Sequence, residues 1–462
     1  MSSDHVQDRL ADYADEIEYP KLPAAAVHAA KARFIDTLGA LIAGFDGRTC
    51  VLARRLASRM PQADGASVLG TPGRTTADLA AFVNTTTSRY AELNDEYHSP
   101  GSSHGHPSDT LMGVFAVAEY AHSSGREFIT AAALAYEVYI GLADATKLPG
   151  FDSANFACIA VAAGAAKLLR LGRAELADAI GLAVVPNNAL DQTRAGQLSM
   201  WKAAAAGQAG RAGVFAALLA REGMHAPSEP FTGERGWLEY VARNQAFELP
   251  PLSGNGESFA VQRTFLKQRS ACASSIPAIF AVERIFAEIG DPSLIQHVTV
   301  EVNRHAKQRR GGGPARNPQT REAADHSIPY VVAAALRDGT ITPRQFDDAH
   351  LADQEIRAIL SRTDIVENPE FTAAFERVPV SHRARVTVEL ADGRVVVGES
   401  GGGGDDLTPA DDIATINAKF TMLVADRIDA ELLEFLWQLE QCDDVASIPP
   451  RLVLRSAATP SS

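Results

Sequence analysis

The sequence is poor in the features that mark several common protein classes. Its 462 residues include only four cysteines, which lie far apart and form no Cys-x-x-Cys pair. We therefore expect neither a disulfide framework nor an iron–sulfur site, and we expect reduced thiols in a cytoplasmic protein. No HExxH segment or other strong metal-binding motif is present, so no metal is expected.

Long uninterrupted apolar runs are also scarce. The alanine-rich stretches are broken by charge or glycine, so we expect no membrane-spanning helix. Residues 1–22 are polar and acidic, unlike a signal peptide. The formal net charge of −14 repels phosphates and anionic lipids, which disfavours nucleic acid and membranes as partners. An anionic substrate would then need a locally basic pocket.

The chain is long and apolar enough to bury more than one core. With 46% apolar residues over 462 positions, two domains are expected. Up to about residue 250, apolar residues recur at helical spacing between Gly and Pro breaks. This pattern predicts an all-α domain, with helices over residues 24–45, 77–90, 110–122, 128–145, 155–171, 174–189 and 198–222.

The pattern changes after Gly254. Residues 296–303 alternate like a strand, and residues 385–397 have the pattern of two strands joined at Asp392-Gly393, a strong hairpin signal. Helical stretches lie between these strands, which favours a smaller α+β domain. The helices expected in this half of the chain cover residues 276–289, 329–336 and 411–439, the last returning to the first domain.

One loop concentrates titratable side chains. Residues 89–109 hold two glutamates, two aspartates and three histidines in a Gly-, Pro- and Ser-rich segment that opens into an apolar helix. His106 stands at that helix entrance, with Ser108 or Asp109 as the candidate N-cap. Free backbone N–H groups and the helix dipole make such a place suitable for a carboxylate.

Other interpretations of this loop compete. His98, His104 and His106 are either ordinary surface residues or, with their acidic neighbours, ligands of zinc or iron, although their spacing matches no strong metal motif. Residues 101–105 match the GxSxG nucleophile elbow. That motif needs a strand directly upstream, and residues 92–100 do not have a strand pattern.

Lys202 is predicted to be a buried lysine. On a helix over residues 198–222 it shares a face with apolar or small residues such as Leu198, Ala206 and Ala209. A buried lysine is costly unless it is paired, so it should have a lowered pKa or an anionic partner such as a bound carboxylate. The alternative is a lysine that snorkels at a helix end.

Two further helix entrances carry similar residues. Lys267 precedes Ser274-Ser275-Ile276-Pro277, and His326-Ser327-Ile328-Pro329-Tyr330 places a proline where a helix should restart. Alone, Tyr330 fits a core residue and Lys267 a solvated one. Together with the loop, the three entrances predict a cofactor-free pocket for a molecule that bears several carboxylates.

Three segments resemble the MmgE/PrpD family: Asn94-Asp95-Glu96-Tyr97 with residues 105–109, Leu198-Ser199-Met200-Trp201-Lys202-Ala203, and Ala324-Asp325-His326-Ser327-Ile328-Pro329-Tyr330. The resemblance runs from about residue 36 to 424. It implies a mainly α protein that forms a homodimer and works without metal or organic cofactor. It also implies a large helical domain built from both chain ends (residues 1–262 and 405–462) and a smaller inserted α+β lid domain (residues 263–404).

The resemblance also implies a set of site residues. The catalytic set is Asp95, His106, Lys202, Lys267 and Tyr330, and the substrate-binding set is Glu92, Arg194, Ser108 and His326. Dehydration of a 2-hydroxy polycarboxylate needs one group that removes a proton next to a carboxylate and another that protonates the departing hydroxyl. Our hypothesis is that His106, oriented by Asp95, moves the proton and that Tyr330 donates to the leaving oxygen, with exchangeable roles. Lys202, Lys267 and Arg194 would hold carboxylates.

The outcome of the reaction stays open at this point. The first hypothesis is a 2-methylcitrate dehydratase-like lyase of propionate metabolism, acting on a small tricarboxylate. Cis-aconitate decarboxylase-like or epimerase activity is an alternative, and a non-catalytic polycarboxylate-binding protein is another. Asp152 stands where the decarboxylase branch has histidine, which favours the dehydratase, as does Trp201 before Lys202. Glu96 stands where many members have threonine, and this leaves the substrate open.

Overall fold

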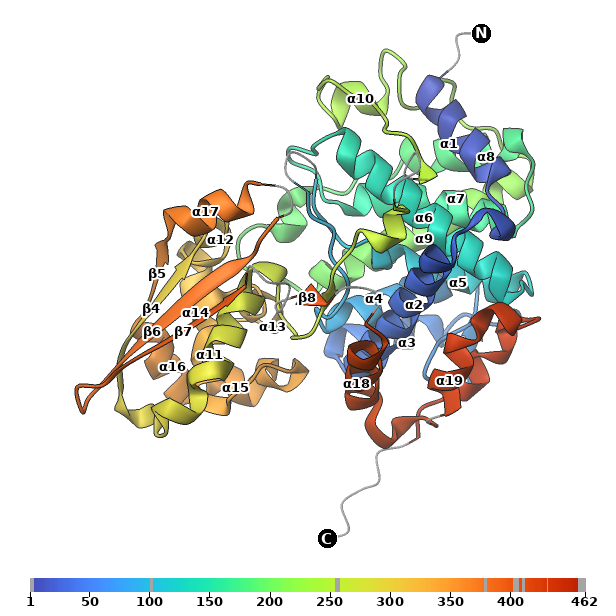
Figure 1. The fold of residues 1–462 in the computed structure, drawn as a ribbon. Helices are drawn as coiled ribbons and strands as arrows, with labels where there is room; N and C mark the ends of the chain where they lie inside the picture. The colour runs from blue at the N-terminus through green and yellow to red at the C-terminus, as the bar shows by residue number, and fades with distance from the viewer. Residues whose placement is uncertain are drawn as a thin grey trace.

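The structure, a computed structural model, describes residues 4–99, 103–253, 258–377, 380–401, 407–408, 412–429 and 431–455. It is mainly helical with small sheets, which confirms the mainly α class. Most buried apolar side chains form two large clusters, one from residues 6–266 and 416–452 and one from residues 271–396. We call the described residues 4–267 and 407–455 the helical unit and residues 271–401 the α+β unit. The two lie side by side in Figure 1. The predicted boundary at residues 404 and 405 lies outside the described residues.

The helical unit contains all seven helices that apolar periodicity predicts in the first half of the chain, with ends shifted by a few residues. Its α-helices are α1 His5–Glu16, α2 Ala24–Gly44, α3 Arg48–Ala57, α4 Ala77–Tyr90, α5 Leu111–Tyr120, α6 Gly125–Ala145, α7 Ala154–Leu168, α8 Arg173–Val184, α9 Trp201–Arg221, α10 Trp237–Tyr240, α18 Ile413–Val424 and α19 Glu431–Trp437. Two strand pairs correct the all-α prediction: β1 Pro61–Ser67 with β2 Arg74–Thr75, and β3 Leu266–Lys267 with β8 Leu407–Thr408.

Small residues let the central helix α9 approach its neighbours α4 and α7. A Cβ atom added at Gly207 would lie 2.2 Å from the Thr86 hydroxyl of α4, and one added at Gly213 would lie 2.6 Å from the Cys158 carbonyl of α7. Lys202, in the first turn of α9, is 2% exposed. The predicted burial of this lysine is confirmed.

The α+β unit is a four-stranded sheet packed against helices. Its strand order is β5-β4-β6-β7, in which β4 and β5 are parallel and the other pairs are antiparallel. The strands are β4 Ile295–Val302, β5 Thr363–Glu367, β6 Arg383–Leu390 and β7 Val395–Gly401. The helices are α11 Ile276–Ile289, α12 Arg304–Arg310, α13 Arg321–Ala324, α14 Ile328–Asp338, α15 Asp348–Ala352, α16 Gln354–Ser361 and α17 Pro369–Phe375. The predicted hairpin is confirmed, with Gly393 at φ +85° in its turn.

Two helices, α6 and α9, have the length and hydropathy of a membrane span. Of the most apolar 18-residue window, 89% is buried in α6 and 72% in α9. Both helices are therefore packed inside the helical unit, where core helices have the same composition. The four cysteines are buried free thiols.

Candidate active site

A cavity of about 690 Å³ lies between the two units. The three predicted helix entrances meet there: His106 before the 3-10 turn η2 (Pro107–Thr110), Ser274 before α11, and His326 before α14. Other polar or aromatic residues of its wall include Arg89, Glu92, Glu96, His98, His104, Lys147, Asp152, Asp191 and Arg194 from the helical unit and Cys272, His305, Arg309, Arg310, Phe375, Glu376 and His382 from the α+β unit.

The loop before η2 is fixed by backbone and side-chain hydrogen bonds. The Asp95 carboxylate accepts from the Ser108 backbone N–H at 3.0 Å and from the Tyr136 hydroxyl at 2.9 Å. Gly105 is required because a Cβ atom there would lie 2.1 Å from the Tyr139 hydroxyl oxygen. Asp95 is 1% exposed and is not part of the cavity wall, so its carboxylate holds the loop in place and does not face a ligand.

Glu92 is the centre of a buried ionic cluster at the inner end of the cavity. Its carboxylate lies 2.5 Å from Arg89 Nη1, 2.8 Å from Lys267 Nζ and 3.0 Å from Lys202 Nζ. Lys202 Nζ also lies 2.6 Å from the Asp325 carboxylate. We call these five residues the Glu92 cluster. The backbone of Glu92 has φ +54°, a conformation unusual for a residue with a side chain and one that tends to occur at functional sites.

The electrostatics of this cluster keep Glu92 ionised. Burial opposes its charge, but Arg89, Lys202 and Lys267 together outweigh burial and hold the pKa of Glu92 well below its usual range. Burial lowers the pKa of Lys202, and Asp325 and Glu92 only partly compensate. Lys267 is also buried, yet Glu92 and Glu96 raise its pKa.

His106 faces Glu92 as a neutral imidazole. Burial and the charges of Arg89 and Lys267 hold the pKa of His106 well below its usual value. Nδ1 lies 2.7 Å from the backbone carbonyl of Asp95, which can only accept, so Nδ1 carries the proton. Nε2 therefore carries the lone pair, and it lies 3.9 Å from Glu92 Oε1. Asp95 does orient His106, but through its backbone carbonyl.

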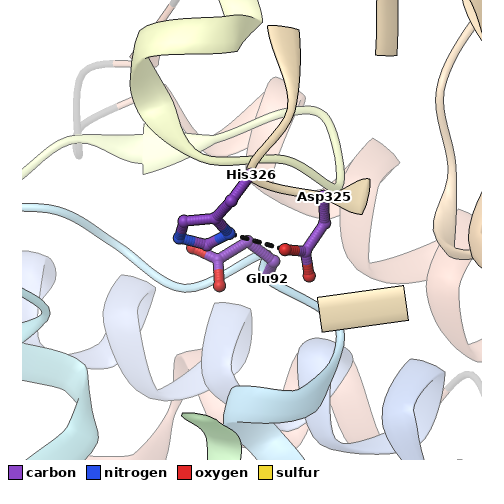
Figure 2. A group of neighbouring side chains, drawn as sticks. All are labelled: Glu92, Asp325 and His326. Atoms are coloured by element: carbon purple, nitrogen blue, oxygen red, sulfur yellow. Dashed lines mark hydrogen bonds and ion pairs between the residues drawn. The ribbon is translucent and has the colours of Figure 1, made fainter. Parts of the chain in front are cut away.

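His326 is a second neutral imidazole at the same place. Its Nδ1 lies 2.5 Å from Asp325 Oδ1. Figure 2 shows the ring beside the Glu92 carboxylate, with Nδ1 turned toward Asp325. Burial and the nearby charge of Lys202 lower the pKa of His326 to about 3. Among the histidines of the cavity wall, His106 and His326, one from each unit, thus lie beside an ionised carboxylate and can accept a proton.

The same atoms form a geometric candidate for a metal site. Ligand atoms of Glu92, Asp325 and His326 lie within 4.8 Å of one another. Lys202 and Lys267 already occupy the carboxylate oxygens, so a metal ion would have to displace ammonium groups. The donor set therefore fits the protein's own cations better than a metal. The loop histidines proposed as ligands form no such group within the described residues.

Several predicted site residues lie elsewhere. Tyr330 is fully buried in the core of the α+β unit, and its hydroxyl donates to the Gln345 carbonyl at 2.7 Å. It is absent from the cavity wall, which corrects the expectation that it faces a substrate. The reason is that α14 packs Tyr330 against the unit's interior, beside Phe346.

Ser108 is likewise buried, 1% exposed, and accepts from the Asn94 side chain instead of lining the cavity. Neither Ser108 nor Asp109 is an N-cap, since no side-chain cap bond is present at η2 or α5. Arg194 does line the cavity, where it pairs with Asp152 at 2.6 Å. Lys202 and Lys267 lie behind Glu92 and do not line it. The GxSxG match includes residues 101 and 102, which lie outside the described residues.

Sequence reasoning missed the contribution of the α+β unit to the cavity. His305, Arg309 and Arg310 come from α12, Phe375 from α17, and His382 directly precedes β6. The rings of His305 and Phe375 stack with centroids 5.6 Å apart, and His98 of the helical unit lies 4.7 Å from Phe375. The available signal was the run of basic residues from 304 to 310, which has no apolar periodicity.

Comparisons with known proteins agree with this architecture. The model of the MmgE/PrpD N-terminal domain matches residues 8–250, and that of the MmgE/PrpD C-terminal domain matches residues 270–444. The chain therefore belongs to the MmgE/PrpD family. The second match includes α18 and α19, which pack on the helical unit. The family resemblance inferred from three short segments is confirmed.

Known members of the MmgE/PrpD family are similar to this chain over most of its length. The 2-methylcitrate dehydratase of Cupriavidus necator is 28% identical over 426 residues, covering 85% of this chain and 84% of that protein. The 2-methylcitrate dehydratase of Escherichia coli K12 is 28% identical, covering 78% and 77%. A cis-aconitate decarboxylase-like protein of Aspergillus oryzae is 24% identical, covering 85% of each chain.

Proposed function

We propose that this MmgE/PrpD protein is a hydro-lyase that removes water from a small 2-hydroxy tricarboxylate, or adds it in reverse, without a cofactor. The observation that carries the proposal is the pair of neutral imidazoles, His106 and His326, beside the ionised Glu92 at the inner end of one cavity. The similarity to 2-methylcitrate dehydratases supports the same reaction class.

His106 is suited to be the base. Its Nε2 lone pair is available at neutral pH because the pKa of the ring is low and Nδ1–H is held by the Asp95 carbonyl. Removal of a proton from the carbon next to a carboxylate would form an imidazolium, which Glu92 stabilises at close range. Asp95 acts as a positioning residue for this step.

His326 is suited to serve the departing hydroxyl. The pKa of His326 is about 3 without a ligand, so the ring becomes a proton donor only when a bound polycarboxylate adds negative charge to the cavity and raises that pKa. Asp325 accepts from Nδ1 and stabilises that form, so Nε2–H can protonate the leaving oxygen. In this assignment His326 takes the role that we expected of Tyr330.

The test is turnover of citrate, 2-methylcitrate, cis-aconitate and iminodisuccinate by the purified protein, followed by absorbance of a new double bond and by product mass. We expect loss of one water from a hydroxy tricarboxylate. Release of carbon dioxide from cis-aconitate would overturn the dehydratase in favour of the decarboxylase, which the Aspergillus oryzae relative makes the second candidate. Thermal stabilisation by these acids without any turnover would indicate a binding protein.

A further inference from the structure

The cations at the inner end of the cavity are already neutralised. Lys202 pairs with Asp325, Lys267 pairs with Glu92 and, at 3.5 Å, with Glu96, and Arg194 pairs with Asp152. Arg89 lies between Glu92 at 2.5 Å and Asp109 at 3.5 Å. The carboxylates of a substrate that lie away from the reacting carbon therefore need positive charge elsewhere in the cavity, because the inner cluster has no cation left to match them.

Three other cations of the cavity wall have no such partner. Among the described residues, the side chains of Lys147, Arg309 and Arg310 line the cavity and take part in no ion pair or side-chain hydrogen bond. Lys147 lies at the exposed rim of the helical unit, just after α6. Arg309 and Arg310 are adjacent at the end of α12, on the α+β unit.

The helix that carries the arginines is held at both ends. The Asn303 side chain caps its start by accepting from the Ala306 N–H at 2.8 Å. At its end, Gly311 is pressed against β5, since a Cβ atom there would lie 2.7 Å from Ile365 Cγ2. The backbone that carries Arg309 and Arg310 is therefore fixed, so binding an anion has to order only their side chains.

Both arginines affect the pKa of titratable side chains in the cavity. After burial and Lys202, the charge of Arg310 is a cause of the low pKa of His326, and both arginines contribute to that of His104. Burial raises the pKa of Asp191, a carboxylate of the cavity wall, and the charges of both arginines partly offset this rise. Asp191 forms no ion pair with either arginine. Both arginines therefore lie within electrostatic range of His104 and Asp191 in the cavity wall, and Arg310 also lies within range of His326.

We propose that Arg309 and Arg310 form a carboxylate-binding subsite that holds the end of the substrate remote from His106. The subsite rests on the proposed function and defines its substrate class as an aliphatic acid with at least two carboxylates, one at the inner end and one at the arginines. Planar guanidinium groups bind carboxylates through paired hydrogen bonds. Because the arginines belong to the α+β unit and His106 to the helical unit, the bound acid bridges the two units.

The test compares Arg309→Gln, Arg310→Gln and the double variant with Lys307→Gln. Lys307 is an exposed cation on the same helix that does not line the cavity, so it controls for loss of charge. Calorimetry with tricarballylate, an unreactive tricarboxylate, should show binding weakened by about 10- to 100-fold for each arginine removed and unchanged for Lys307→Gln. Arg310→Lys should recover part of the loss. With a reactive substrate, KM should rise more than kcat falls.

The outcomes separate the subsite from the reaction. Equal tricarballylate affinity of the wild type and the double variant would overturn the subsite, even if the wild type dehydrates a tricarboxylate. Weakened affinity in the arginine variants, together with no water loss from any substrate, would support the subsite and overturn the hydro-lyase. A uniform loss in all variants, Lys307→Gln included, would indicate a general charge effect and also overturn the subsite.

Discussion

At the scale of single residues, the site depends on which groups are charged. His106 is neutral with Nε2 unprotonated, whereas Glu92 is ionised, and both states follow from burial combined with neighbouring charges. The sequence identified both residues and the burial of Lys202. It could not show that His106 bonds the carbonyl of Asp95 instead of its carboxylate, because a backbone and a side-chain acceptor at the same residue give the same sequence signal.

Replacing His106 should abolish catalysis and spare binding. For His106→Asn we expect kcat on the wild-type substrate to fall by about 10²- to 10⁴-fold, the usual contribution of a general base. Tricarballylate affinity should change little, because no step of binding needs Nε2. His225→Asn is the matched control, since that side chain is 87% exposed. Unchanged kcat in His106→Asn, measured by the double-bond absorbance, would disprove the assignment of the base.

Removing the charge of Glu92 should destabilise the fold. In Glu92→Gln, Lys202 keeps Asp325 and Lys267 keeps Glu96, so we expect a loss near the lower end for a broken buried ion pair, about 3 kcal/mol. Urea denaturation at pH 7 measures it. Glu376→Gln removes an exposed carboxylate from the wall of the same cavity and should have little effect. Equal stability of the two variants would mean that the charge of Glu92 does not stabilise the cluster.

At the scale of elements, periodicity predicted what lies in a core and missed what faces the cavity. Seven helices of the first half of the chain and the hairpin of β6 and β7 were found because their apolar residues repeat, whereas α1 and α3 were not predicted. Helix α12 was missed because Ala306 is its one buried residue, so no apolar pattern marks it. The parallel strand β5 is too short and polar to be distinguished from a loop.

The orientation of α14 decides the role of Tyr330. Every residue from Ile328 to Leu336 is buried. Because this helix has no polar face along that stretch, its sequence does not show which side faces the cavity. In Tyr330→Phe we expect kcat to stay at the wild-type value, and stability to fall by about 1 kcal/mol from the lost bond to Gln345. Steady-state kinetics and urea denaturation check both. A loss of kcat of about 100-fold or more would restore Tyr330 as an acid.

At the scale of the whole molecule, the two units meet through aromatic rings as well as through the cavity. His382, at the start of β6, lies 5.8 Å from the ring of His98 and 6.5 Å from that of Phe265, both of the helical unit, and 5.4 Å from Phe375. A charge on His98 opposes protonation of His382, whereas the Glu96 carboxylate favours it. His382 is 6% exposed, and burial lowers its pKa from 6.5 to about 4.

This contact makes stability depend on pH. Between pH 6.5 and about 4 the unfolded chain protonates His382 and the folded chain does not, so the unfolded state binds more protons and stability falls as pH falls. Lowering the pH from 7 to 5 should therefore reduce the free energy of unfolding by about 2 kcal/mol through His382. His382→Asn should therefore lose about 2 kcal/mol less than the wild type over that interval in urea denaturation, whatever its absolute stability. Parallel losses in the wild type and His382→Asn would show that His382 is protonated equally in both states, and that the ring contacts between the units do not exclude its charge.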